Sequence, residues 1–201
     1  MKKIFLLLII SSYLICSSAE WSPFKNMIIP GMGIPNIDNY DKIKKNYLLR
    51  EVLIWGVLFS SNQNRDIYSD NYINYGISYA STNVDSFNFQ YAINVGDYES
   101  MSDYNSAMLG RRLPDKVYPN DEGYDWNWES NKDRLKYRDM LRTSRDFDKI
   151  GDFAIAGLII HRIVALINYN YLKNNGELLG ISSNIYKCDP QTIQLELRFN
   201  L

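Results

Sequence analysis

Two stretches near the start of the chain carry apolar residues at helical spacing. The first, over 41–61, predicts a helix that is apolar on all sides from Val52 to Phe59. A polar break is predicted at 62–64, followed by a second helix. One face of that second helix carries four tyrosines at helical steps: Tyr68, Tyr72, Tyr75 and Tyr79. We interpret them as a packing stripe, and a stacking platform for sugars or bases is the alternative.

A longer helix is predicted in the last third of the chain. The segment Ser130-Asn131-Lys132-Asp133 is typical of a helix N-terminus, because Ser and Asp side chains accept hydrogen bonds from the first free amides. The apolar pattern continues to Leu172, with a kink allowed at Gly151. Asn174-Asn175-Gly176 is a strong stop signal.

The end of the chain alternates between apolar and polar residues, which is strand periodicity. Its apolar positions are Ile193, Leu195, Leu197, Phe199 and Leu201. Residues 179–186 can pair with this strand across a turn containing Asp189-Pro190, so a β-hairpin is predicted over 178–201. Residues 87–95 fit both strand and helix spacing. Residues 97–129 are predicted to be irregular, because glycines and prolines interrupt them.

These patterns predict a mainly α protein with two apolar helices and a C-terminal β-hairpin. A single domain is expected over 41–201. A Pro- and Gly-rich lead-in over 20–40 precedes it, and this segment should be a loop because it cannot form one helix. The 46% hydrophobic and 22% charged residues are ordinary for a globular protein, which excludes disordered and fibrous classes.

The first 19 residues have the features of a secretory signal peptide. Lys2-Lys3 precedes an apolar run from Ile4 to Ile15, and Ser17-Ser18-Ala19 supplies the small residues that a signal peptidase reads. We therefore predict cleavage after Ala19 and export to the periplasm or the membrane-associated cell envelope. A lipoprotein signal acylated at Cys16 and an uncleaved anchor helix are the alternatives.

Residues 46–61 and 153–167 are candidate membrane segments. Each is about 15 residues long, below the roughly 20 needed for a simple span. Each also contains charge, Arg50-Glu51 in the first and Arg162 in the second. Basic residues precede both segments, and two consecutive spans cannot both place that side in the cytoplasm. We expect membrane association, through a pair dipping into one leaflet; helices buried in an exported soluble domain are the alternative.

Net charge and rare residue types narrow the chemistry. A formal charge of −1 offers no basic field, so we expect no nucleic-acid partner. One His and two Cys leave few ligands for a metal or haem, and we expect neither a metal nor a cofactor. Cys188, the Cys outside the leader, is interpreted as a small apolar residue.

Few residues are candidates for a functional site. His161 is the one usual general base, and its apolar neighbours favour a satisfied core histidine. One helical face is predicted to be salt-bridged or to contact anionic lipid or a partner; it comprises Arg134, Arg138, Arg142 and Arg145. Residues 120–125 resemble a calcium loop without EF-hand spacing, so a turn is expected. Trp126 and Trp128 are expected to fill a small core rather than to line a sugar cleft.

Four pieces in this order resemble an uncharacterised family of small bacterial envelope proteins, a domain of unknown function with an Ile-Pro-Gly motif. They are Ile29-Pro30-Gly31-Met32-Gly33, the apolar helix that follows it, Arg138 to Asp146, and the apolar helix through His161-Arg162-Ile163-Val164-Ala165. Members are usually predicted to be membrane proteins, and the resemblance implies no activity. This chain departs from the family at Ile34, where Gln is frequent, and lacks the Asp that many members carry in the last helix.

The sequence therefore predicts an exported envelope protein that is structural or accessory and non-enzymatic, with membrane or envelope components as partners and a homo-oligomer left open. The alternative is a periplasmic hydrolase or ligand-binding module using residues 97–129; a carboxylate beside His161 would favour the enzyme. We also predict that the two apolar helices pack antiparallel, with Trp55 and Phe59 meeting residues near Ile159 and Ile163. Arg50 and His161 would then lie at the edge of the contact.

Overall fold

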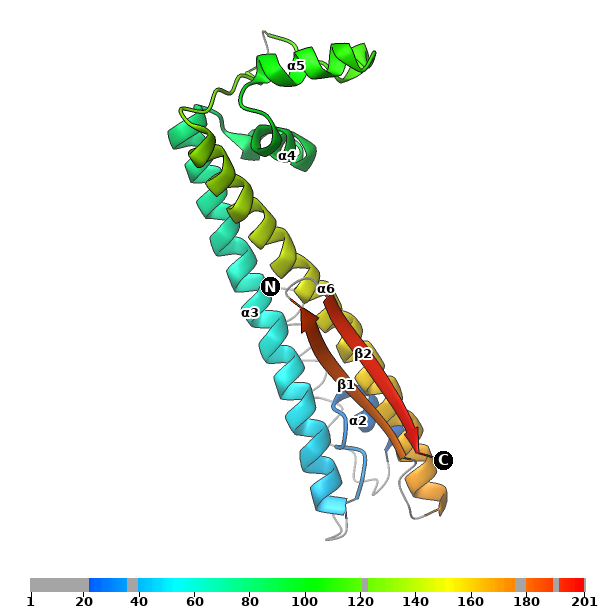
Figure 1. Ribbon diagram of the computed structural model, residues 1–201. Coiled ribbons are helices and arrows are strands. Elements are labelled where there is room, and N and C mark those ends of the chain that lie inside the picture. Colours follow the sequence, from blue (N-terminus) through cyan, green and yellow to red (C-terminus); the bar gives the residue numbers. More distant parts are fainter. Residues whose placement is uncertain (1–21, 36–39, 121–122, 176–179, 190–191, 201) are drawn as a thin grey trace. The chain divides into compact units, whose positions relative to one another are not determined.

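The computed structural model describes residues 22–35, 40–120, 123–175, 180–189 and 192–200, and of residue 175 and the last two ranges it describes the backbone alone. The predicted leader and its cleavage site lie outside these residues. The described chain is mainly α, as the sequence predicts, with five α-helices, α2 to α6 (Figure 1).

Two long helices, α3 (Asp41–Ala80) and α6 (Asn131–Asn175), dominate the chain. The predicted break at 62–64 is wrong, because α3 continues through it. No Gly or Pro lies between Gly56 and Gly76 to stop the helix, and the Asn64 side chain donates to the Ser60 carbonyl at 2.8 Å instead of capping a new helix. The predicted start of α6 is confirmed, since the Asp133 amide donates to Ser130 Oγ at 3.2 Å.

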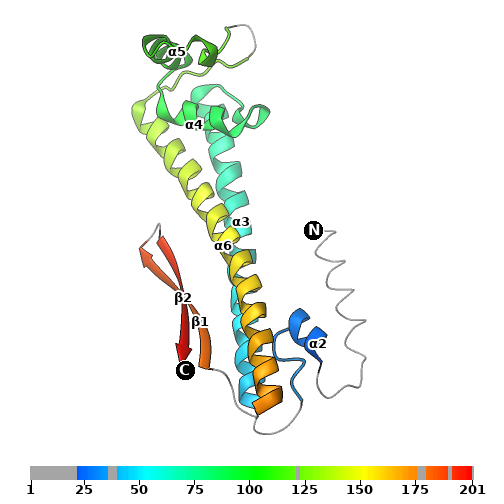
Figure 2. The ribbon, with the colours of Figure 1, turned by 90° about the vertical axis from the view of Figure 1, so that its right-hand side faces the viewer.

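The chain divides into two compact units, where the sequence predicts one domain over 41–201. Unit 1 comprises Met1–Phe59 and Ile150–Leu201, and unit 2 comprises Ser60–Lys149. Both long helices contribute to each unit, and in each the two helices run antiparallel, side by side (Figure 2). Each unit is described below by itself.

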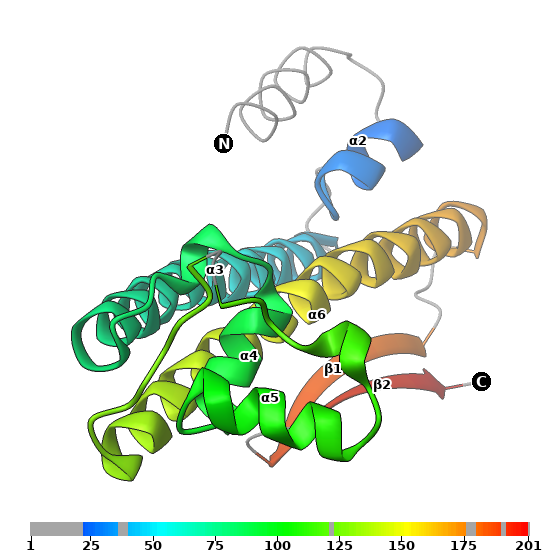
Figure 3. The same cartoon turned by 90° about the horizontal axis from the view of Figure 1, so that it is seen from above.

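Unit 2 contains two further helices, α4 (Phe89–Asp97) and α5 (Met101–Gly110), seen together in Figure 3. Residues 87–95, whose apolar positions fit both strand and helix spacing, are thus mainly helical. The irregular structure predicted for 97–129 is wrong over α5. Both helices begin at good N-caps that the periodicity did not reveal: Asn88 accepts from the Tyr91 amide at 3.0 Å, and Ser100 accepts from the Asp103 amide at 3.1 Å. Short 3-10 turns η2 (Val84–Ser86) and η3 (Pro114–Lys116) complete the unit.

The core of unit 2 is built largely from aromatic rings. Tyr91 and Tyr137 are 1% and 0% exposed, and the Tyr137 hydroxyl donates to the Ala92 carbonyl at 3.0 Å. Tyr72 meets the Tyr137 ring edge-on at 5.6 Å, a favourable aromatic geometry. Tyr72 and Tyr75 of the tyrosine stripe join this core, whereas Tyr79 is exposed, so the predicted packing role is confirmed for these two residues.

Unit 1 adds a short N-terminal segment to the two long helices. A six-residue helix, α2 (Pro23–Ile28), starts at Ser22 within the lead-in that the sequence predicts to be a loop. Asn26 is fully buried; its amide donates to the Ala165 carbonyl of α6 at 2.8 Å, and its oxygen accepts from the Gly31 amide at 2.7 Å. This one side chain fastens the Ile-Pro-Gly segment to α6.

The chain after α6 forms two antiparallel strands, β1 (Gly180–Asp189) and β2 (Thr192–Asn200). Ile185 is paired with Leu195 and Gly180 with Asn200, and the register is irregular between Lys187 and Asp189. The faces of their side chains lie outside what the structure describes, so the inward orientation of the odd-numbered residues of β2 stays a prediction.

Candidate functional site

A buried polar cluster lies between α3 and α6 in unit 1. We use this name for Tyr47, Glu51, His161, Arg162 and Asn168. Glu51 Oε1 accepts hydrogen bonds from Arg162 Nη2 at 2.9 Å and from Trp55 Nε1 at 3.1 Å. Tyr47 Oη accepts from the Asn168 amide at 2.6 Å. These bonds join the two helices at two levels and satisfy several polar atoms that would otherwise be costly to bury, whereas Glu51 Oε2 and Arg162 Nε are buried without a hydrogen bond within the described residues.

His161 occupies the centre of this cluster and is 1% exposed. Its Nε2 lies 3.2 Å from the Tyr47 carbonyl oxygen and 4.0 Å from Glu51 Oε2. The prediction of a satisfied core histidine is confirmed, whereas its expected position at the edge of the contact is wrong. A carboxylate does lie beside it, as an enzyme would need. However, a general base must reach a proton on the substrate, and helix backbone and side chains cover this ring.

Glu51 and Asn26 are the structurally important residues that sequence reasoning missed. The sequence did contain a signal for Glu51. The first apolar segment carries an acidic residue and the second carries an arginine, and opposite charges in apolar helices are expected to pair when the helices pack together. Asn26 gave no such signal, because its two partners are backbone groups.

The outer surface of the same helices is uniformly apolar. We call it the apolar band, and it comprises Leu48, Leu49, Val52, Leu53, Val57 and Phe59 of α3 with Phe153, Ile155, Ile159, Ile163 and Ile167 of α6. Over 47–59 and 153–167 the other exposed residues are Gly56 and Ala156, so no exposed residue in these ranges is polar. Glu51, His161 and Asn168 are buried together with aliphatic residues such as Leu58 and Leu158, the Arg162 side chain is 35% exposed, and the exposed side chains of these ranges are apolar.

The same two helices have the opposite polarity in unit 2. There the exposed residues of α3 include Gln63, Asp66 and Asp70, while the core is formed by Tyr72 and Tyr137. Unit 2 is thus polar outside and apolar inside, as expected of a domain in water. The exposed residues of α3 therefore change from apolar in unit 1 to largely polar in unit 2.

The contact between the apolar helices differs in detail from the predicted one. Leu58 of α3 is buried with Ala154 and Leu158 of α6, and Trp55 packs against them as predicted. Phe59, Ile159 and Ile163 are instead more than half exposed. The helices meet as an antiparallel pair, as predicted, but each is rotated so that its small and polar positions face inward.

Within the described residues, α6 is the one helix that is long and apolar enough to cross a membrane by length and composition. Only 39% of its most apolar 18-residue window is buried.

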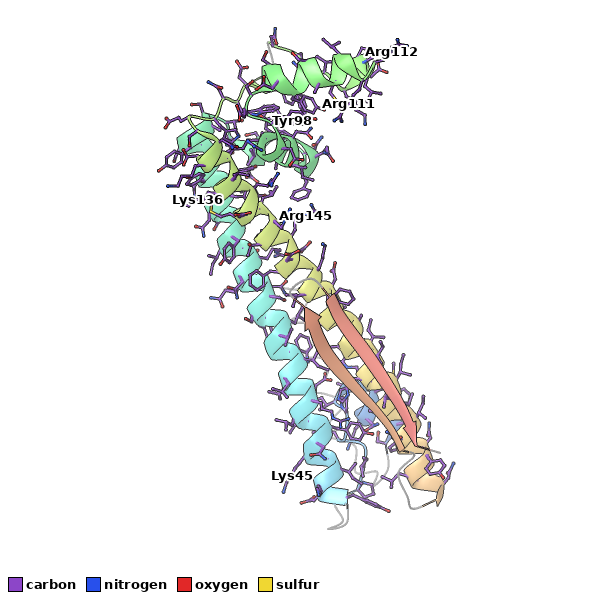
Figure 4. All side chains as sticks on the ribbon, viewed as in Figure 1. Lys45, Tyr98, Arg111, Arg112, Lys136 and Arg145 are labelled. Atoms are coloured by element: carbon purple, nitrogen blue, oxygen red, sulfur yellow. The ribbon has the colours of Figure 1, made fainter. Side chains whose placement is uncertain are left out.

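Three of the four arginines that the helical spacing places on one face have separate partners in unit 2. Arg134 donates to the Gly96 and Asp97 carbonyls at 2.9 and 3.2 Å, where its charge satisfies the C-terminal end of α4. Arg138 lies 3.8 Å from the Asp97 carboxylate, and Arg145 lies over the Phe89 ring (Figure 4). Arg142 is exposed. The predicted salt-bridged face therefore serves mainly to hold α4 against α6.

Residues 97–129, the predicted site of the alternative enzyme or binding module, are used for packing. Trp126 and Trp128 are 3% and 6% exposed, and their indole N–H groups donate to the Tyr98 carbonyl at 3.2 Å and the Val95 carbonyl at 2.7 Å. The prediction that they fill a core is confirmed. The acidic turn at 120–125 falls partly outside the described residues.

Two tyrosines of unit 2 have raised pKa values. Burial raises the pKa of Tyr118 to about 12, although an Asn94 amide donating to its oxygen at 2.7 Å acts in the opposite direction. Burial and the Asp133 carboxylate, 2.5 Å from its hydroxyl, raise the pKa of Tyr75 to about 12. Both phenols are therefore neutral hydrogen-bonding groups at physiological pH rather than acids or bases.

No group of three or more His, Cys, Asp or Glu side chains in the described part of the chain is placed to hold a metal ion. Comparison with protein-family models, with curated proteins and with solved structures gave no match to this chain.

Proposed function

We propose that this protein is an exported component of the cell envelope, structural or accessory and non-enzymatic, that associates with a membrane through the apolar band. The observation that carries the proposal is the reversed polarity of unit 1, where Glu51 and His161 are buried while every exposed residue over 153–167 is apolar. A patch of this extent is costly in water and is usually covered by lipid or protein.

Three further observations support the proposal. The N-terminal 19 residues have the pattern of an export signal. The Ile29 to Gly33 segment resembles the motif of small bacterial envelope proteins. His161 and the tryptophans of 97–129 are enclosed by packing, so neither candidate for catalysis or ligand binding offers an open site. The C-terminal hairpin is proposed as an accessory element of the exported part.

Membrane fractionation with a carbonate wash tests the proposal. The tagged full-length protein should remain in the washed membrane pellet, should float with lipid in a density gradient, and should be extracted by mild detergent. Release of the unmodified protein into the wash, or a pellet that neither floats nor dissolves in detergent, would contradict membrane association.

Two double variants make the test specific to the apolar band. Ile159→Gln with Ile163→Gln removes two exposed isoleucines of the band and should shift protein from the pellet to the wash. Ile67→Gln with Ile77→Gln removes two exposed isoleucines of unit 2 and should leave the distribution unchanged. Equal release of the two variants would argue against the band as the membrane contact.

A further inference from the structure

Arg50 is a basic residue that lies within the apolar band of α3. It is half-buried, and its neighbours Leu49 and Leu53 are 58% and 60% exposed. The adjacent acid, Glu51, is already engaged, because it pairs with Arg162 across the helix contact at 2.9 Å. Arg50 makes no ion pair with any residue that the structure describes. Its charge therefore lies beside exposed aliphatic side chains without a protein carboxylate to neutralise it.

Two further polar side chains continue from Arg50 toward the N-terminus of α3. Asn46 and Lys42 precede it by four and eight residues, so the three share one face of the helix, and both are exposed. We call Lys42, Asn46 and Arg50 the basic stripe. Helical side chains lean toward the helix N-terminus, so the Arg50 guanidinium is expected to extend toward Asn46 rather than toward the middle of the band. The acid of this first turn, Asp41, pairs with Lys45 at 3.9 Å instead.

The second helix adds positive charge at the same end of unit 1. Tyr47 of α3 packs with Tyr169 and Leu172 of α6, so the N-terminal end of α3 meets the C-terminal end of α6. Lys173 follows Leu172 directly and is exposed, and Figure 4 shows Lys45 near the N-terminal end of α3. Exposed cations are thus gathered at this end, immediately beside the apolar band.

From this juxtaposition we infer that the basic stripe binds the headgroup of an anionic phospholipid, whose acyl chains lie along Leu49 and Leu53. The inference rests on the proposed function and names the class of lipid that this part of the band contacts. Guanidinium, ammonium and amide N–H groups all donate to phosphate oxygens, and these are the polar groups that the stripe carries.

An anionic lipid fits this face better than a protein does. The face places unneutralised cations next to exposed leucines, and a phospholipid carries an anionic group and apolar chains in one molecule. A second copy of this chain would bring the same cations to the contact, which like-charge repulsion disfavours. An acidic hydrophilic protein would neutralise Lys42 and Arg50 but would leave Leu49 and Leu53 exposed to water.

Thermal unfolding with defined lipids tests the inference. The full-length protein in mild detergent receives phosphatidylglycerol or phosphatidylcholine at equal mole fraction. A ligand that binds the folded state raises the melting temperature, and we expect phosphatidylglycerol to raise it by at least about 2–4 °C more than phosphatidylcholine does. Increasing the salt from about 0.05 M to about 0.5 M should shrink this difference, because the contact is electrostatic and near the surface. Equal shifts with the two lipids would overturn the inference.

Three double variants make the test specific to the basic stripe. Lys42→Gln with Arg50→Gln should abolish the difference between the two lipids, whereas Lys42→Arg with Arg50→Lys keeps both charges and should retain it. Lys132→Gln with Arg142→Gln removes two exposed cations of unit 2 and should also retain it. Equal loss in the two Gln variants would indicate a general effect of net charge, and an unchanged difference in Lys42→Gln with Arg50→Gln would place the lipid elsewhere. Either result overturns the inference.

Native mass spectrometry identifies the occupant independently of stability. We expect the protein to retain phosphatidylglycerol in preference to phosphatidylcholine, and the Lys42→Gln, Arg50→Gln variant to lose this preference even where it unfolds at a lower temperature. A dimer that retains no lipid would identify a second copy as the occupant and overturn the inference. Inorganic phosphate added alone should leave the melting temperature unchanged, and an equal shift with phosphate would show a free-anion site instead of a lipid site.

These outcomes separate the inference from the proposed function. Protein that resists the carbonate wash but responds equally to the two lipids is membrane-associated without selecting anionic lipid, so the inference fails and the function stands. Protein released by the wash contradicts both.

Discussion

At the scale of single residues, two glycines show how the same residue type has unrelated roles in unit 1. A Cβ on Gly33 would lie 2.1 Å from the Ser22 carbonyl oxygen and 2.7 Å from Asn26 Cβ, so only glycine allows the lead-in to fold back on itself. A Cβ on Gly56 would meet nothing within 4 Å. Glycine at the first position is a packing requirement, and at the second it is a weakness in a helix.

Alanine at these two positions should act in opposite directions. Gly33→Ala should destabilise unit 1 by about 1–3 kcal/mol, because a backbone carbonyl must move. Gly56→Ala should stabilise it by about 0.5–1 kcal/mol through helix propensity. Thermal unfolding of the detergent-solubilised protein measures both effects. A destabilised Gly56→Ala would show that the surface around Gly56 is covered.

Tyr118 links residue chemistry to the pH dependence of stability. Its pKa rises from about 10 in the unfolded chain to about 12 in unit 2, mainly through burial. The neutral phenol is thus favoured in the folded state, and this contribution is complete below pH 10 and is lost as pH rises through about 12. Tyr118→Phe should therefore flatten the fall in stability between pH 10 and 12, measured by near-UV circular dichroism. Tyr79→Phe is the control, and an unchanged slope for Tyr118→Phe would contradict the assignment.

At the scale of elements, α3 and α6 are held together in unit 1 by polar contacts as well as by packing. Their buried contacts form two small clusters, one of Leu58 with Ala154 and Leu158, and one of Tyr47 with Ala165, Tyr169 and Leu172. The Glu51–Arg162 pair adds a charged contact at one level of the helices, and the bond between Tyr47 and Asn168 adds a neutral one. These contacts fix the register of α3 against α6, because a shift of one turn would bury unpaired charge.

A double-mutant cycle should detect this coupling. Glu51→Gln and Arg162→Gln should each lower the free energy of unfolding by about 1.5–3 kcal/mol, since each leaves a charged hydrogen-bonding partner unsatisfied. The double variant should lose less than the sum of the two. Asp152→Asn, an exposed carboxylate on α6, should change stability by less than about 0.5 kcal/mol. Strict additivity would show that the pair does not set the register.

The C-terminal strand is predicted to be one-sided. Burying a Leu or Phe side chain contributes about 1.5–3 kcal/mol, so Leu197→Asp should strongly destabilise the element. Glu196→Lys, on the opposite face, should be nearly neutral. Thermal unfolding compares them, and equal effects would count against an inward face formed by the odd-numbered residues.

At the scale of the whole molecule, the chain combines two units with different surfaces. Unit 2 has an aromatic core and a largely polar exterior, and the helix pair of unit 1 has a mixed polar and apolar interior and an apolar exterior over 47–59 and 153–167. The chain changes from one kind to the other near residues 60 and 150, within continuous helices. The proposed structural or accessory function assigns membrane contact to unit 1 and leaves the polar surface of unit 2 for other envelope components.

The proposed export of the protein depends on the predicted leader. Cleavage after Ala19 should give a mature protein whose N-terminus is Glu20, because Ser17 and Ala19 present small residues to the peptidase. Mass spectrometry of the protein from the envelope fraction tests this directly. A lipid-modified N-terminus at Cys16, or an intact Met1, would identify one of the two alternative leaders.

Sequence periodicity predicted the long apolar helices, because a helix brings residues three or four positions apart onto one face. It therefore predicted the mainly α class, the start of α6 at Ser130 and the core role of the tyrosine stripe. The sequence pattern predicted a helix break at 62–64 because three consecutive polar residues are typical of a helix end. These residues are nevertheless compatible with a helix, and α3 continues through them to Ala80.

Only the tertiary structure decided which side of each apolar helix faces inward. The stretch from Val52 to Phe59 is apolar all round, so its periodicity contains no preferred face, and the interhelical bonds of Glu51 select one. The same is true of Asn26, whose partners lie 5 and 139 residues away in sequence. The local sequence pattern shows that these segments are helical and apolar. Their orientation is determined by the pairing of a few buried polar groups that are far apart in the sequence.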